Sequence, residues 1–137
     1  MTKENESYFE AIAKIIKLTQ EEKIKWQTAT KKPKILEGIE KIDSAYTGEY
    51  LGKTLRIYKV YTKSEKPYLP DIHTSFSLLV RPTEYQWTYS IVLEIIDKDG
   101  NVMWTFPNLN ILSDLYEEIG YKIAGVSDFI CELLKEK

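Results

Sequence analysis

A chain of 137 residues with 43% hydrophobic and 29% charged residues has the size and composition of one globular domain, and its formal net charge is −2. Its single cysteine, Cys131, excludes an intramolecular disulfide, and no apolar run approaches the roughly 20 residues that a membrane-spanning helix needs. The acidic start, with Glu4 and Glu6, lacks the apolar segment of a secretory signal, so we expect a cytoplasmic protein with a single domain over residues 1–137.

The first predicted element is an amphipathic helix. Ser7 and Glu10 match the S-x-x-E capping box, in which the two side chains bind backbone N–H groups of the first turn. Apolar residues then recur at helical spacing in one stripe: Tyr8, Phe9, Ile12, Ile15 and Ile16. The pattern predicts a helix from Ser7 to about Glu22 or Lys23.

A lysine-rich segment follows the helix. Residues 23–34 hold five lysines and no acidic residue. Alternation over residues 24–27 indicates a short edge strand that includes Trp26, and residues 30–34 are typical of an exposed loop. Apolar residues at nearly helical spacing then predict a short helix over residues 35–43.

The middle of the chain has the period-two pattern of β-strands. Five strands are predicted, over residues 45–51, 54–62, 74–80, 87–96 and 102–106. Gly52-Lys53 is interpreted as the two-residue loop of a type II′ hairpin, residues 63–71 with two prolines as a loop, and residues 97–101 as a turn around Gly100. Because the connections are too short for crossover helices, the sheet should be an antiparallel meander.

The carboxyl-terminal part is predicted to be helical. Asn110 is a candidate cap for a helix with an apolar stripe, Gly125 marks a break, and Ser127 is a candidate cap for a second piece. The stripe residues are Leu112, Leu115, Tyr116, Ile119 and Ile123, followed by Phe129, Ile130, Leu133 and Leu134. The predicted fold is therefore α+β, with a five-stranded antiparallel meander sheet and with the amino-terminal helix and the carboxyl-terminal helices packed on one face.

Residues that could carry catalysis are few. A structural zinc site needs four Cys or His ligands, and the chain has only His73 and Cys131, so we predict no metal site; no motif indicates a cofactor. Cys131 is interpreted as a packing residue. His73, which Asp71 could orient, is a weak candidate for a general base, because a lone histidine at the start of a strand is more often a surface residue. We therefore expect a protein that is not an enzyme.

Cations interleaved with aromatic rings suggest nucleic-acid binding as an alternative function. Backbone phosphates bind cations and unpaired bases stack on rings. The residues that this pattern selects are Trp26, Arg56, Tyr58, Lys59 and Tyr61, in the 23–34 lysine segment and in the strand over residues 56–63. Against nucleic-acid binding stand the acidic net charge and the use of lysine to protect edge strands from aggregation.

Ten tyrosines and three tryptophans favour protein binding. These side chains are enriched among interface anchors, although strands are rich in them for packing reasons alone. The leading hypothesis is a non-catalytic protein-binding or accessory module that docks on another protein or on itself. The alternative is a nucleic-acid-binding protein, and an enzyme centred on His73 ranks third. No membrane partner is expected.

The order of elements also resembles a group of proteins. An opening helix, the run Lys23-Ile24-Lys25-Trp26, a tyrosine-rich meander, Asp99-Gly100 and a closing helix with Leu115-Tyr116 are similar to small uncharacterised α+β proteins of bacteria and phages. The resemblance spans most of the chain and implies no activity and no catalytic residues.

Overall fold

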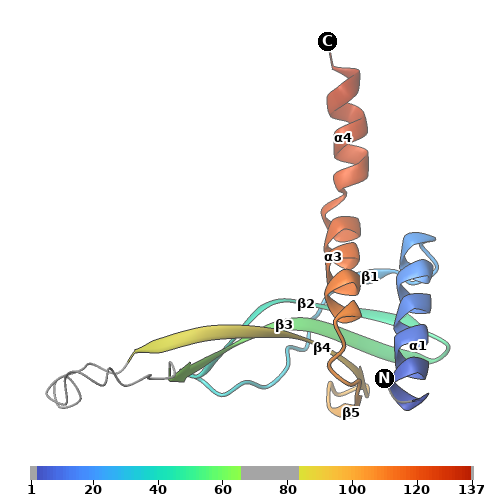
Figure 1. Cartoon of the computed structure of the whole chain (residues 1–137). Helices are drawn as coiled ribbons and strands as arrows, with labels where there is room; N and C mark the ends of the chain where they lie inside the picture. Colours follow the sequence, from blue (N-terminus) through green and yellow to red (C-terminus); the bar gives the residue numbers. More distant parts are fainter. Residues whose placement is uncertain (1–2, 66–83, 137) are drawn as a thin grey trace, which may run out of the picture.

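The structure, a computed structural model, describes residues 3–65 and 84–136 and consists of one open sheet with helices at one end (Figure 1). The elements in chain order are α1 (Lys3–Gln20), β1 (Trp26–Thr28), β2 (Glu40–Tyr50), β3 (Lys53–Glu65), β4 (Tyr85–Ile96), β5 (Val102–Thr105), α3 (Ile111–Ala124) and α4 (Val126–Lys135). The α+β class predicted from the sequence is confirmed.

The sheet is the predicted antiparallel meander, with strands in the order β1-β2-β3-β4-β5. In its centre Ile57 pairs with Tyr46 on one side and with Leu93 on the other. The set of strands differs from the prediction. β3 pairs directly with β4, the short strand around Trp26 is the fifth member, and the strand expected over residues 74–80 lies outside the described residues.

The core lies between α1, α3 and one face of the sheet. Alternation turns Leu55 and Ile57 of β3 toward the helices, where Ile12 of α1 and Leu115 of α3 meet them. These four side chains are at most 6% exposed. The prediction that both helical ends pack on the same sheet face is confirmed for α1 and α3, but Phe9, expected in this contact, is 40% exposed.

The last helix does not follow the prediction. No residue of α4 is buried, and Figure 1 shows α4 standing away from the sheet. The chain turns at Gly125, which has a left-handed φ of 64° and donates its N–H to carbonyls at the end of α3. The break was predicted, but α4 then leaves the body and does not pack on the sheet.

The predicted helix caps make no side-chain cap bonds, although Asn110 directly precedes α3 as predicted. Ser7 lies inside α1, which already includes Lys3, and its hydroxyl donates to the Lys3 carbonyl at 3.3 Å. A serine inside a helix can bond back to the preceding turn in this way, so the S-x-x-E pattern does not mark a start. Asn110 has helical backbone angles and makes no side-chain cap bond, and Ser127 lies inside α4.

The helix predicted over residues 35–43 is also wrong. Only one turn forms there, closed by a 2.8 Å bond from the Glu40 N–H to the Leu36 carbonyl, and Glu40 then begins β2. Gly38 has a φ of 82°, which interrupts helical geometry. The apolar residues of this turn are exposed: Ile35, Leu36 and Ile39.

The hairpin between β2 and β3 forms one residue earlier than predicted. Tyr50 pairs with Lys53, so the loop is Leu51-Gly52, with φ values of 53° and 76°. Two positive φ values define a type I′ turn, whose twist matches that of the strands, in place of the expected type II′ turn. Leu51 is 84% exposed and gains no burial that would offset its left-handed backbone.

This turn gives the first prediction. Asparagine tolerates the left-handed region, so Leu51→Asn should raise the free energy of unfolding by about 1 kcal/mol. The measurement is urea unfolding followed by circular dichroism. Gly52→Ala, which places a Cβ at a φ of 76°, should change the stability in the opposite direction. Equal midpoints for Leu51→Asn and the parent would contradict the strain at Leu51.

Candidate functional site

The five residues predicted to bind a ligand lie in three different environments. Neighbours along a strand point to opposite faces. Arg56 and Tyr58 therefore lie on the sheet face away from α1 and α3, whereas Lys59 and Tyr61 share the face of Leu55 and Ile57. Trp26 packs against the core. The strand over residues 56–63 does not present one continuous surface.

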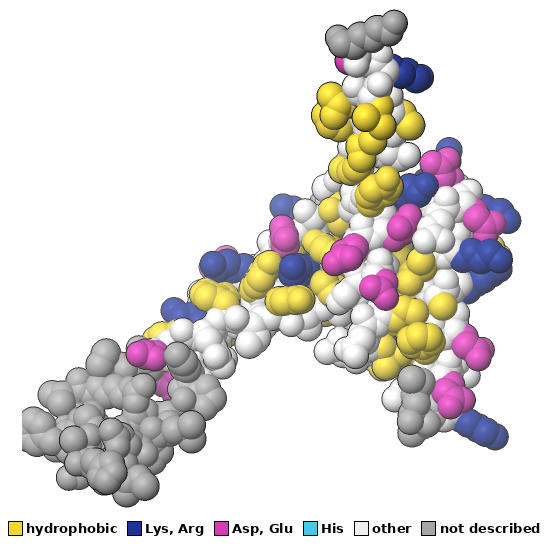
Figure 2. Space-filling model, turned by 45° about the horizontal axis from the view of Figure 1, so that its top comes forward, with side chains coloured by type: hydrophobic (Ala, Val, Ile, Leu, Met, Phe, Trp, Pro, Cys, Tyr) yellow, Lys and Arg dark blue, Asp and Glu magenta, His cyan; other side chains and the backbone are white. Residues whose placement is uncertain are grey.

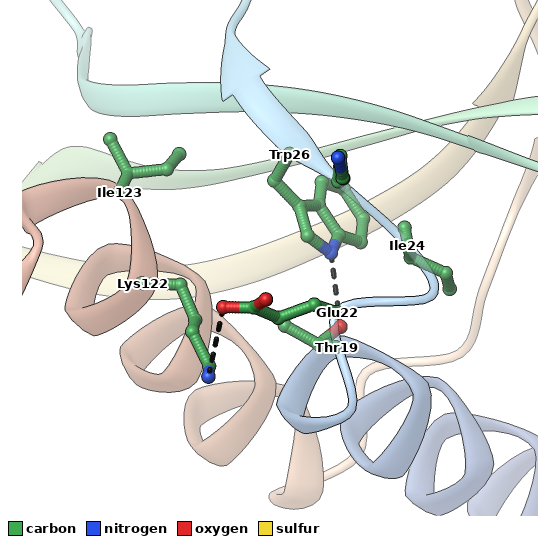
Figure 3. Close-up of a pocket in the computed structure, with 7 residues that line it drawn as sticks. Thr19, Glu22, Ile24, Trp26, Lys122 and Ile123 are labelled. Atoms are coloured by element: carbon green, nitrogen blue, oxygen red, sulfur yellow. Dashed lines mark hydrogen bonds and ion pairs between the residues drawn. The ribbon is translucent and has the colours of Figure 1, made fainter.

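Trp26 joins α1 to the sheet (Figure 3). Its indole N–H donates to the Thr19 hydroxyl at 3.0 Å, and that hydroxyl donates to the Ile15 carbonyl at 2.8 Å. The ring covers Gly48 of the neighbouring strand so closely that a Cβ there would lie 3.0 Å from it. The position and hydrogen bond of Trp26 are those of a packing residue.

A small hollow of about 270 Å³ opens beside Trp26, lined by Thr19, Glu22, Ile24, Lys25, Trp26, Lys122 and Ile123 (Figure 3). Several of its polar groups are already paired: the Lys122 amine lies 3.8 Å from the Glu22 carboxylate and the indole N–H binds Thr19, while Lys25 adds one more charge to the wall. Pockets for small molecules usually measure 300–1,000 Å³ and hold convergent polar groups. The hollow therefore offers little chemistry of its own.

Arg56 belongs to a buried ion pair on the opposite face of the sheet. Its Nε donates to the Glu94 carboxylate at 2.6 Å, and both side chains are about 2% exposed. Its Nη1 donates to the carbonyls of Lys31 at 3.1 Å and Gly100 at 3.2 Å. Arg56 thus fastens the loop after β1 and the β4–β5 turn to the sheet, and it is not accessible to a ligand.

The same burial affects Tyr58, two residues along β3. Burial, aided by the negative charge of Glu94, raises the pKa of the Tyr58 phenol to about 12. The neutral phenol is therefore the form that the folded protein favours. Tyr58 is half-buried on the sheet face away from α1 and α3, and its aromatic ring is not open for stacking.

A different group of side chains forms an exposed surface. β3 and β4 continue past the helices as an arm, made of residues 40–42, 59–65 and 85–90 (Figure 1). One face of this arm, here named the aromatic–lysine face, consists of Lys41, Lys59, Tyr61, Lys63, Tyr85, Trp87 and Tyr89, and it ends at the exposed Glu65, which pairs with Tyr85. The register places them together, because Tyr61 pairs with both Lys41 and Tyr89, and Lys63 pairs with Trp87. Figure 2 shows blue and yellow side chains next to one another along the arm.

Each lysine of this face lies over a ring. The amine of Lys41 is 4.1 Å from the ring centre of Trp87, that of Lys59 is 4.3 Å from Tyr89, and that of Lys63 is 4.5 Å from Tyr85. The rings are open to solvent, with 55% of Tyr85, 41% of Trp87 and 60% of Tyr89 exposed. Of the predicted binding residues, Lys59 and Tyr61 belong to this surface.

The sequence contained a signal for the remaining members. Tyr85, Trp87 and Tyr89 share one side of a strand by period-two spacing, as do Lys59, Tyr61 and Lys63. Their proximity depends on the direct pairing of β3 with β4. The sequence did not predict this pairing, because a strand was expected between them over residues 74–80. Lys41 was assigned to a helix that does not form.

The second exposed surface is α4. Its apolar residues lie along one side and are uncovered, with exposed fractions of 64% for Phe129, 44% for Ile130, 56% for Leu133 and 78% for Leu134. Figure 2 shows these yellow side chains along the projecting helix. Cys131, expected to be a packing residue, is exposed as well.

Three remaining expectations concern the candidate catalytic residues, a metal site and a membrane-spanning helix. His73 and Asp71 lie outside the described residues. In the described ranges, no three His, Cys, Asp or Glu side chains form a group that could hold a metal ion. Among the helices of residues 3–65 and 84–136, none is long and apolar enough to cross a membrane.

Comparison with known proteins gives no relative: no family model, curated protein or solved structure matches this chain.

The Arg56–Glu94 pair gives the second prediction. Glu94→Ala leaves a buried guanidinium without its partner and should lower the free energy of unfolding by about 3–5 kcal/mol. Replacing both residues by leucine should recover most of this loss, because the uncompensated charge is removed too. Urea unfolding measures both, with Glu117→Ala on an exposed helix face as control. A Glu94→Ala variant as stable as the control would contradict the structural role.

The third prediction concerns alkaline pH. The pKa of Tyr58 is raised from about 10 to about 12, so its stabilising effect is complete below pH 10 and is lost as the pH rises from 10 to 12. Tyr116, whose pKa burial also raises to about 12, acts in the same direction. Tyr58→Phe should weaken the fall in unfolding free energy over this range. An unchanged pH profile would count against burial of Tyr58.

Proposed function

We propose that this protein is a non-catalytic protein-binding module and that α4 is the element that docks on the partner. The observation that carries the proposal is the exposed apolar side of α4, which no described part of the fold covers. Fully burying a Leu, Ile or Phe side chain stabilises a protein by about 1.5–3 kcal/mol relative to leaving it in water. Four such side chains in one helix form a favourable contact surface.

The spacing on α4 fits the recognition of a helix in a groove. Val126, Phe129, Ile130, Leu133 and Leu134 recur at intervals of three and four residues, as the anchors of such helices do. Asp128, Glu132 and Lys135 occupy the other side and keep it hydrated. A ten-residue helix is about 15 Å long, so it presents two to three turns to a partner.

The connection to the body supports the same function. Gly125 ends α3 in a left-handed conformation, which a residue without a Cβ adopts easily, and α4 begins at the next residue. Figure 1 shows that this geometry holds α4 clear of the sheet, where a groove on another molecule can enclose it. The partner is another protein or a second copy of this chain, as the sequence suggested.

The fourth prediction tests α4. Phe129→Glu together with Leu133→Glu places charges at the centre of the apolar side and should abolish docking. Because these side chains are exposed, the free energy of unfolding should change little. Sedimentation velocity detects self-association, and affinity capture with quantitative mass spectrometry detects another protein.

The matched control is Asp128→Lys together with Lys135→Glu, which changes two charges on the opposite side of α4. A dimer or a captured protein should be retained by the control and lost by the apolar-side variant. If the parent is a monomer and captures nothing that the apolar-side variant loses, the proposal is wrong.

A further inference from the structure

We infer that the aromatic–lysine face of the arm binds single-stranded nucleic acid, a function independent of the contact that α4 makes. The inference rests on three properties of the described residues: the confinement of the lysines to one face of the arm, the exposure of the rings and the position of Lys59 and Lys63 on a central strand. The sequence suggested nucleic-acid binding, but with Trp26, which is half-buried against the core, and Arg56, which is buried in an ion pair.

Positive charge is confined to one face of the arm. Lys41, Lys59 and Lys63 all lie on it; Lys41 pairs with Tyr61 and Lys63 with Trp87, whereas Lys59 pairs with Ile91 and reaches the ring of Tyr89. The opposite face of β3 and β4 carries uncharged residues at the alternate positions: Thr62, Ser64, Gln86, Thr88 and Ser90. Among the described residues no carboxylate lies within 4.0 Å of the three amines, so they are available to an anion.

The protection of strand edges does not explain Lys59 and Lys63. Lys59 and Lys63 belong to β3, which lies between β2 and β4 and has partners on both sides. Lysine discourages edge-to-edge association only when it lies on an edge strand. Lys59 and Lys63 are half-buried on a central strand and contact rings there, and an anionic ligand would give their charges a role that edge protection does not.

The rings add a preference for unpaired bases. Tyr85, Trp87 and Tyr89 follow one another at every second position of β4, which spaces them by roughly 6.7 Å. Bases of a single strand can stack on such platforms, whereas those of a duplex stack on each other. An acidic peptide would satisfy the lysines but has no flat ring system to cover the tyrosines, so the combination favours a nucleic acid.

The net charge of −2 does not oppose this binding mode. At physiological salt, charges separated by more than about 8 Å are largely screened, so a ligand on the arm responds to the charges around it. Acidic residues of α3, such as Asp114 and Glu117, belong to the body and not to the arm. On this face three lysines outnumber one carboxylate, that of Glu65, so the local charge is positive.

The fifth prediction follows from these contacts. A fluorescently labelled oligothymidine of roughly 16 nucleotides, the upper site size of a single-strand-binding fold, should bind the full chain in an anisotropy titration. Three lysine–phosphate contacts predict a slope of log K against log salt of about −2. Changing Lys41, Lys59 and Lys63 together to Gln should lower affinity about tenfold or more and bring the slope close to zero. Tyr85→Ala, at the exposed end of β4, should lower affinity about fivefold with the slope unchanged.

Matched controls separate this inference from general charge effects. Changing Lys14, Lys17 and Lys53 to Gln removes the same charge from exposed positions outside the arm and should leave affinity within about twofold. The α4 variant Phe129→Glu with Leu133→Glu should bind as the parent does, so that failure of either proposal is seen separately. Circular dichroism shows that each variant is folded, and Tyr85→Phe serves if Tyr85→Ala does not fold.

Three results would overturn the inference. The first is no saturable binding of oligothymidine or of oligouridine, the RNA probe. The second is equal loss in the arm and control lysine variants. The third is competition by polyglutamate or by a duplex of the same length as effective as competition by the unlabelled single strand, which would make the face a general polyanion site.

Discussion

The structure depends on one constraint: two helices cover only part of a sheet whose central strands are long. β3 and β4 have 13 and 12 residues, which corresponds to roughly 40 Å of strand, whereas a helix with its side chains is about 10–12 Å wide. α1 and α3 cross the strands at one end, over Leu55, Ile57, Ile91 and Leu93, and the hydrophobic contact there holds the fold together. Among residues 3–65 and 84–136, no helix covers the strands beyond this contact, and the rings of Tyr85, Trp87 and Tyr89 are open to water there.

The two faces of the sheet bury different kinds of side chain. The helix side uses apolar side chains, and the other side uses the Arg56–Glu94 pair, whose guanidinium also binds two loop carbonyls. A buried pair of this kind contributes little net stability, but removing one partner is costly. The pair therefore fixes the loops that follow β1 and β4 to the body.

The sequence predicted what local patterns control and missed what depends on long-range pairing. The alternation around Ile57 and Leu93 and the apolar stripe around Leu115 identified β3, β4 and α3. These patterns are reliable because the side chains that a strand or helix buries recur with the period of that element. Short polar signals failed: Ser7 bonds back within α1, and the Gly52 turn is one residue early with Leu51 in a strained conformation. The site was predicted in part only, since Lys59 and Tyr61 were chosen together with Arg56 by proximity in sequence. The alternation of residues along a strand determines the face on which each side chain lies. It does not determine which strands become neighbours in the sheet.

The contact of each lysine with a ring gives the arm a physical basis for exchange of partners. In the free protein the ammonium groups of Lys41, Lys59 and Lys63 lie over aromatic faces, an interaction worth about 0.5–1 kcal/mol at exposed sites. A phosphate attracts the same ammonium group more strongly, through a charge-assisted hydrogen bond. When the lysine moves to the phosphate, the ring face that it leaves becomes free for a base. One event thus creates both contacts that a single strand needs, and the small energy of the ring contact keeps the cost of that rearrangement low.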